Sequence, residues 1–176
     1  MTTLKPDPDN RLQDTGATLD ELAQWPAERL TVEELRTAVA ANEIDSVIIA
    51  TPDTQGSLYG KSMPADMFLA GHHMHFSSGP LIYDIEWVPL VGGFPRIGPQ
   101  NAWADFVVDP DVRSLRRLAN LPGSAIVFGV GRWLADDAPV QELPRRILER
   151  QLHRLQERGV AMVCAAENEF YVFPED

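Results

Sequence analysis

The stretch PRRILERQLHRLQERGVAMVCAAENEFYVF, residues 144–173, joins a helix pattern directly to a strand pattern. Its first half places apolar residues at helical spacing, at Ile147, Leu148, Leu152 and Leu155. Gly159 is a typical helix C-terminal stop, and the apolar run 160–173 that follows is typical of a strand. With SAIVFGV at 124–130 as the preceding strand, the order strand–helix–strand predicts a parallel β-α-β unit.

The residues upstream predict a mixed set of short helices and strands. A polar tail over 1–16 and a short helix over 18–25 come first. A capping box, in which Thr31 is paired with Glu34, predicts a helix that ends near Asn42. The remaining elements are strands at 46–50 and 57–62 joined by a turn at 51–56, a short helix from Pro64, a β-like run at 81–91, a strand at 104–109 and a short helix at 112–118.

The amino-acid composition limits the kinds of molecule that the chain is expected to bind. The chain has 176 residues, a net charge of −11 and a sequence pI of about 4.7. An acidic protein of this kind is not expected to bind nucleic acid or an acidic membrane surface. No run approaches the ~18 apolar residues that span a membrane, and no signal peptide is evident, so we expect a cytoplasmic protein. The single cysteine, Cys164, excludes an internal disulfide and is expected to be a buried structural thiol.

Two acids interrupt the last predicted strand. Side chains alternate along a strand, so Glu167 and Glu169 face the same way, roughly 6.5–7 Å apart. Neighbouring carboxylates in an apolar strand repel each other and lose hydration. A hard divalent cation such as Mg²⁺ or Mn²⁺, bound by both carboxylates, would relieve the repulsion and replace the lost hydration. The alternative is that the two acids lie at a solvated sheet edge, where they face water and bind no ligand. The spacing alone leaves both interpretations open, as it does for the GHHMH run at 71–75, which is either an exposed loop or a metal site.

Four ordered segments resemble the glutamine synthetase superfamily. The run ENEFYVF is similar to that family's E-x-E-F-x-x-F strand. The segment DSVIIATPDTQGSLYGKSMPADMFL resembles its early hairpin, with matching positions at Asp53, Gly56, Gly60, Lys61 and Pro64. The segment ADFVVDPDVRSLRRL is similar to the strand that leads into the catalytic domain, and the segment from Ala138 to Phe173 is similar to the first β-α-β unit of that domain. The resemblance is greater to γ-glutamyl ligases that use amines than to the housekeeping enzyme.

The resemblance implies a fold and a reaction. The expected fold is α/β (α+β): a β-grasp-like domain over 30–110 after a tail and short helix over 1–29, and then the beginning of a catalytic domain over 111–176. The implied reaction uses ATP and Mg²⁺ or Mn²⁺ to join glutamate to ammonia or an amine through a γ-glutamyl phosphate. Glu167 and Glu169 would be metal ligands, and the intact protein would be a homo-oligomer with active sites between subunits.

The resemblance also sets limits on this chain. Family members continue for hundreds of residues beyond the E-x-E strand, so we expect an incomplete catalytic domain that is inactive alone. No residue of the chain is assigned to ATP. The family's acid near the ammonium position has one candidate here, Asp84, whose other interpretation is a turn carboxylate. The alternative to a ligase is a non-catalytic homologue that interacts with a full-length relative.

Overall fold

The computed structural model describes residues 29–90 and 92–173. The predicted tail over 1–16 and the helix over 18–25 lie outside these residues. The elements are α2 (Val32–Ala40), β1 (Ser46–Pro52), β2 (Leu58–Pro64), α3 (Ala65–Leu69), β3 (Met74–Ser77), β4 (Asp105–Pro110), β5 (Arg116–Arg117), β6 (Ser124–Trp133) and α4 (Pro144–Glu157), with three short 3-10 helices at Gly79–Ile82, Pro99–Asn101 and Val112–Ser114.

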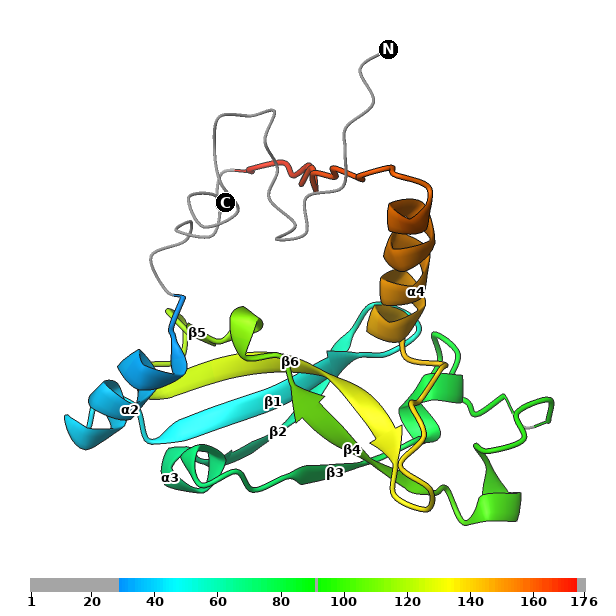
Figure 1. Cartoon of the computed structure of the whole chain (residues 1–176), viewed down its shortest axis with the longest axis horizontal. Coiled ribbons are helices and arrows are strands. Elements are labelled where there is room, and N and C mark those ends of the chain that lie inside the picture. The colour runs from blue at the N-terminus through cyan, green and yellow to red at the C-terminus, as the bar shows by residue number, and fades with distance from the viewer. Residues whose placement is uncertain (1–28, 91, 174–176) are drawn as a thin grey trace.

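Within the described residues, the strands form one mixed sheet in the order β2-β1-β6-β4-β3, and β5 pairs with one end of β6 (Figure 1). The two central strands, β1 and β6, run parallel, while the other neighbours are antiparallel. This is the arrangement expected of a β-grasp-like domain. The mixed α and β fold class predicted from the sequence is therefore confirmed.

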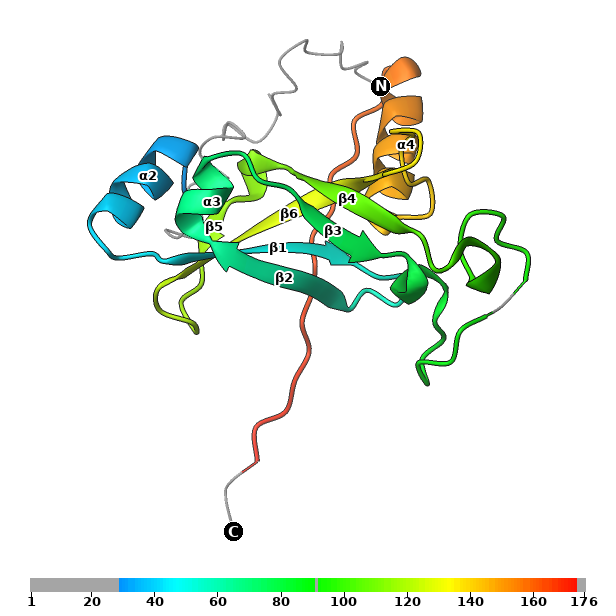
Figure 2. The same ribbon diagram turned by 90° about the horizontal axis from the view of Figure 1, so that it is seen from below.

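The sheet curls until its two edge strands meet. The Nζ atom of Lys61 on β2 donates a hydrogen bond to the main-chain oxygen of His75 on β3, at 2.6 Å. Beside this bond, the rings of Tyr59 and Phe76 pack edge to face with centroids 5.8 Å apart. Figure 2 shows the two strands side by side. Among the described residues no backbone ladder joins β2 to β3, so these side chains close the seam.

The core lies inside this curled sheet, where apolar side chains from the strands meet those of α2 and the loops. Its largest fully buried members include Leu35, Ile49, Phe76, Phe106 and Val127. The capping box predicted for α2 is present, because Thr31 accepts a hydrogen bond from the Glu34 N–H and the Glu34 carboxylate accepts one from Thr31 N–H. That cap fixes where α2 begins, and Leu35 on its inner face anchors the helix on the sheet.

The strand predicted over 160–173 is wrong for this structure. Residues 160–173, which follow α4, are exposed and form neither helix nor strand, and Figure 1 shows them apart from the sheet. The predicted parallel partner, β6, has no room for it, since β1 lies along one edge and β4 and β5 lie along the other. The prediction that Cys164 is buried fails for the same reason, because the cysteine is exposed.

Two other predictions differ from the structure. The β-like run predicted over 81–91 is instead the 3-10 helix Gly79–Ile82 followed by a tight turn. The apolar side chains of Leu81 and Ile82 are buried in the core from this helix, and the two residues do not belong to a strand. The helix predicted over 112–118 is one 3-10 turn, Val112–Ser114, and then β5. The domain boundary near Pro110 stays a prediction; β4, which ends at Pro110, pairs with β6 along five positions.

Candidate functional site

The two predicted metal ligands lie on the extended segment that follows α4. Glu167 and Glu169 are both exposed. Farther along the same segment, the rings of Tyr171 and Phe173 lie 6.4 Å apart, as side chains two residues apart do in extended backbone. Glu167 and Glu169 have the same two-residue spacing, so both acids would face one side if the backbone between them is extended in the same way.

The carboxylate oxygens of Glu167 and Glu169 are suitable ligands for a hard divalent ion, but two side chains alone do not complete a metal site. Mg²⁺ takes six oxygen ligands in near-octahedral geometry, and two carboxylates leave most of that shell to water. Within residues 29–90 and 92–173 no cluster of three or more histidine, cysteine, aspartate or glutamate side chains could hold a metal ion. The structure therefore offers two suitable ligands and would need others from elsewhere.

Asp84 caps a turn. Its Oδ1 atom accepts hydrogen bonds from the N–H groups of Glu86 and Val88, both at 2.9 Å, and the turn closes through the Trp87 N–H on the Asp84 carbonyl at 3.0 Å. These hydrogen bonds are those expected if Asp84 is a turn carboxylate, the second of the two interpretations of this residue. A catalytic role for it stays a prediction, and one that would compete with these bonds.

The motif positions Asp53, Gly56, Gly60, Lys61 and Pro64 build the β1–β2 hairpin and its seam. The buried Asp53 carboxylate accepts hydrogen bonds from the N–H groups of Gln55 and Ser57, both at 2.9 Å. Gly56 adopts φ +87°, and a Cβ on Gly60 would lie 2.6 Å from the Ile49 carbonyl oxygen. The motif is therefore structural within this chain, and no local pattern predicts that Lys61 bridges the two edges.

A second polar cluster ties α4 to the sheet, and sequence reasoning missed it. Asp111, directly after β4, accepts hydrogen bonds from Arg113 (2.9 Å from Nε to Oδ1) and from Arg145 in the first turn of α4 (3.1 Å). The pKa of Asp111 lies below its usual value, chiefly because of the Arg113 hydrogen bond and further because of the charge of Arg145. The Arg145 guanidinium also lies over the ring of Phe128 on β6, at 5.9 Å.

The three histidines of the GHHMH run at 71–75 belong to no cluster that could hold a metal ion among the described residues. His72, His73 and His75 are all exposed, and the contact made by His75 is through its main-chain oxygen at the seam. The predicted exposure of the histidines fits this placement, but the run is only partly a loop, because Met74 and His75 belong to strand β3 and pair with β4. Among the described residues no helix is both long and apolar enough to cross a membrane.

Comparison by sequence gives one strong match. The chain is 38% identical over 147 residues to a γ-glutamylethanolamide synthetase of Streptomyces coelicolor, and the match covers 82% of this chain. It covers 31% of the relative, so the chain spans about a third of the length of the curated relative that it matches. No family model matches the sequence.

Comparison by structure agrees on the fold. A GmaS structure in complex with ADP matches with a TM-score of 0.50 and 19% identity, over 70% of this chain and 26% of that one. A structure described as a novel glutamine synthase homologue matches with a TM-score of 0.54 and 18% identity, over 65% of this chain and 27% of that one. The sequence match assigns the chain to the glutamine synthetase superfamily, in the branch that contains γ-glutamylamine ligases, and the structural likenesses show the same fold.

Proposed function

We propose that this chain is part of an ATP-dependent ligase that joins the side-chain carboxylate of glutamate to an amine through a γ-glutamyl phosphate. The observation that carries the proposal is the 38% identity over 147 residues to a γ-glutamylethanolamide synthetase. That relative's name makes a small primary amine such as ethanolamine the first amine to test, before ammonia. The body built on the β-grasp-like sheet would position α4 and the segment 160–173 at the start of a catalytic domain.

In this proposal Glu167 and Glu169 bind Mg²⁺ or Mn²⁺. The metal, when bound, neutralises phosphate charge during transfer of the phosphoryl group of ATP. The role of this chain is to present two carboxylates on one side of an extended segment. The other ligands, the nucleotide site and the glutamate site would come from further polypeptide, so the chain alone would not turn over. Ring-forming homo-oligomers with sites between subunits and a cytoplasmic location are part of the same proposal.

A chimera tests the function directly. The matched residues of the Streptomyces coelicolor enzyme are replaced by those of this chain, and ADP release is measured with glutamate plus ethanolamine, and with glutamate plus ammonia. We expect turnover with ethanolamine by the chimera and none by the isolated chain.

Glu167→Gln and Glu169→Gln should each abolish most of the turnover of the chimera. Asn168→Ala should not, because residue 168 alternates to the opposite side. A chimera that assembles like the parent enzyme but releases no ADP with any amine would overturn the proposal.

A further inference from the structure

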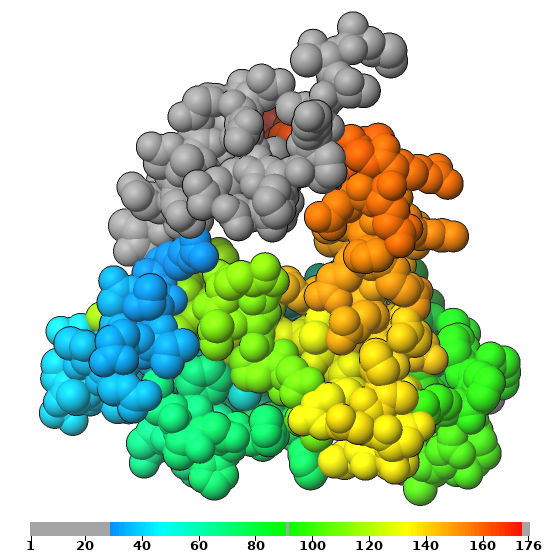
Figure 3. All heavy atoms as spheres, in the orientation of Figure 1, coloured from blue at the N-terminus to red at the C-terminus, as the bar shows by residue number. Residues whose placement is uncertain are grey.

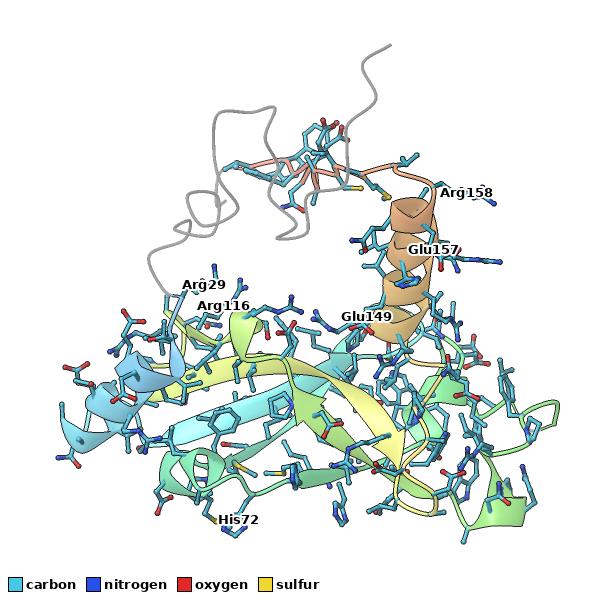
Figure 4. All side chains as sticks on the ribbon, in the orientation of Figure 1. Arg29, His72, Arg116, Glu149, Glu157 and Arg158 are labelled. Carbon is cyan, nitrogen blue, oxygen red and sulfur yellow. The ribbon has the colours of Figure 1, made fainter. Side chains whose placement is uncertain are left out.

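Two arginines face each other where the start of the described chain pairs with β5. Arg29 forms an antiparallel bridge with Arg116, and the Leu30 N–H donates to the Leu115 carbonyl at 2.9 Å. This bond makes Arg29 and Arg116 a non-hydrogen-bonded pair, the kind whose side chains lie closest together. Leu30 and Leu115 are buried, so alternation turns both arginines away from the core. Figure 4 shows both side chains on the side of the sheet from which α4 rises.

The two opposed guanidiniums repel each other. Side chains of the same charge directly across a strand pair destabilise that pair. Among the described residues no carboxylate forms an ion pair with Arg29 or Arg116. Arg116 Nε instead donates to the Ser114 carbonyl at 3.2 Å, which limits the movement of its guanidinium. An anion bound by both arginines would remove the repulsion.

A third arginine lies on the same face of β6. Arg116 pairs with Ile126, and the guanidinium of Arg145 on α4 lies 5.9 Å from the ring centre of Phe128. Ile126 and Phe128 are two residues apart on one strand, so their side chains face the same way, about 7 Å apart. Arg145 also has an unused donor, because its Nε–H is buried and has no hydrogen-bond partner in the described part of the chain. Figure 3 shows residues 112–118, in yellow-green, between the blue start of the described chain and the orange α4.

The acids near these arginines do not neutralise them. Arg113 and Arg145 both donate to Asp111, which is one carboxylate for two guanidiniums. Glu149, whose charge also acts on Arg113, is itself paired with Arg146 at 2.8 Å. We refer to Arg29, Arg113, Arg116 and Arg145 as the arginine face. It is a positive surface on a chain whose net charge is −11.

We propose that the arginine face binds a small phosphate-bearing anion, with a phosphoryl group between Arg29 and Arg116 and within reach of Arg113 or Arg145. A guanidinium presents a planar fork of N–H donors that matches phosphate oxygens. One such fork fills the two oxygens of a carboxylate, whereas a phosphoryl group offers three strong acceptor oxygens and can bind several arginines. The proposal goes beyond the ligase function, in which these arginines have no assigned role.

Isothermal titration calorimetry of the 176-residue chain with pyrophosphate tests the site. The titration is made in about 0.1 M salt, which screens weak attraction between exposed charges. We expect saturable binding of one pyrophosphate per chain. Succinate, which carries two carboxylates and no phosphoryl group, should bind more weakly.

Three variants separate phosphate recognition from general attraction. Arg116→Gln should lower the affinity for pyrophosphate about 10-fold or more, because a hydrogen-bonded charge pair is lost. Arg158→Gln removes the same charge from an exposed arginine at the far end of α4 (Figure 4), and this matched control should bind like the original chain. Arg116→Lys keeps the charge but not the fork, so it should bind more weakly than the original chain.

Circular dichroism checks that each variant folds like the original chain. Four outcomes would overturn the proposal: no saturable binding of pyrophosphate, succinate that binds as tightly as pyrophosphate, the same loss of affinity in Arg158→Gln as in Arg116→Gln, or full affinity in Arg116→Lys.

Discussion

At the scale of single residues, two buried hydroxyl groups on β1 and β2 lie in an apolar setting beside the seam of the sheet. The Tyr59 hydroxyl is buried, and the structure gives it no hydrogen-bond partner among the described residues; the same is true of Thr51 Oγ1 on the neighbouring strand. Burial raises the pKa of Tyr59 well above its ordinary value, and the charge of Asp53 raises it further. The phenol therefore stays protonated at all ordinary pH values and serves packing rather than acid–base chemistry.

Tyr59→Phe should raise the free energy of unfolding by up to about 1 kcal/mol, because it removes a buried, unpaired hydroxyl and keeps the ring against Phe76. Urea denaturation followed by tryptophan fluorescence measures the change. Thr51→Val removes the other unpaired hydroxyl and should change stability in the same direction. A clear loss of stability in both variants would mean that the two hydroxyls are bonded in solution.

Asp111 gives a prediction for acid pH. Its pKa is lowered in the folded state by Arg113 first and Arg145 second, so the group contributes stability above its unfolded pKa of about 4. That contribution is lost as the pH falls through the lowered folded value. Asp111→Asn should cost about 1 kcal/mol at pH 7, since Arg113 is exposed and solvent screens the pair. The difference between the two proteins should shrink as the pH falls from about 4 through the lowered folded pKa of Asp111; a constant difference from pH 7 to pH 2 would exclude the charge as its cause.

At the scale of elements, the sequence predicts the local structure well where periodicity and caps decide it. The capping box at Thr31, the β1–β2 hairpin and α4 with its stop at Gly159 are all confirmed. Each depends on neighbours in sequence, so a short window holds the necessary information.

The failures come from contacts between distant segments. The run 160–173 has strand character, but a strand also needs a free edge, and β6 has none. No local pattern shows that β1, β4 and β5 would occupy those edges. The bonds from Asp111 to α4 and from Lys61 to β3 also join residues far apart in sequence, so the pattern around each residue could not predict them. For Glu167 and Glu169, the sequence predicts that both side chains face one side of an extended backbone. It does not predict which other groups surround the two carboxylates.

The pairing of β4 with β6 depends on a glycine. Gly129 lies opposite Pro110, and a Cβ there would come within 2.4 Å of both the Asp109 carbonyl oxygen and a Val108 methyl. Gly129→Ala should therefore force the strands apart and cost about 1–3 kcal/mol of unfolding free energy. Gly79→Ala is the matched control, because its nearest neighbour is the Tyr83 side chain at 3.2 Å, which can move. Equal stability of the two variants, measured by thermal unfolding, would show that the strand contact is looser than described.

At the scale of the whole molecule, the chain divides into a packed body and an uncovered end. The body is a curled sheet with its own core, while α4 is fixed mainly through its first turn and the segment beyond it is exposed. This end exposes apolar side chains that a larger catalytic domain would cover. They lie along α4, at Ile147, Leu148 and Leu152, and at the end of the segment beyond it, at Phe170, Tyr171, Val172 and Phe173. The superfamily match over 31% of the relative's length is consistent with this division.

The central claim is that Glu167 and Glu169 become metal ligands when the rest of a catalytic domain surrounds them. Binding of Mn²⁺ to the chimera with the Streptomyces coelicolor enzyme, followed by electron paramagnetic resonance, tests it without requiring turnover. The account predicts that a chimera with both glutamates changed to glutamine loses bound Mn²⁺, while the Asn168→Ala chimera binds as many ions as the unchanged one. Equal Mn²⁺ binding by all three proteins, each assembled like the parent enzyme, would contradict it.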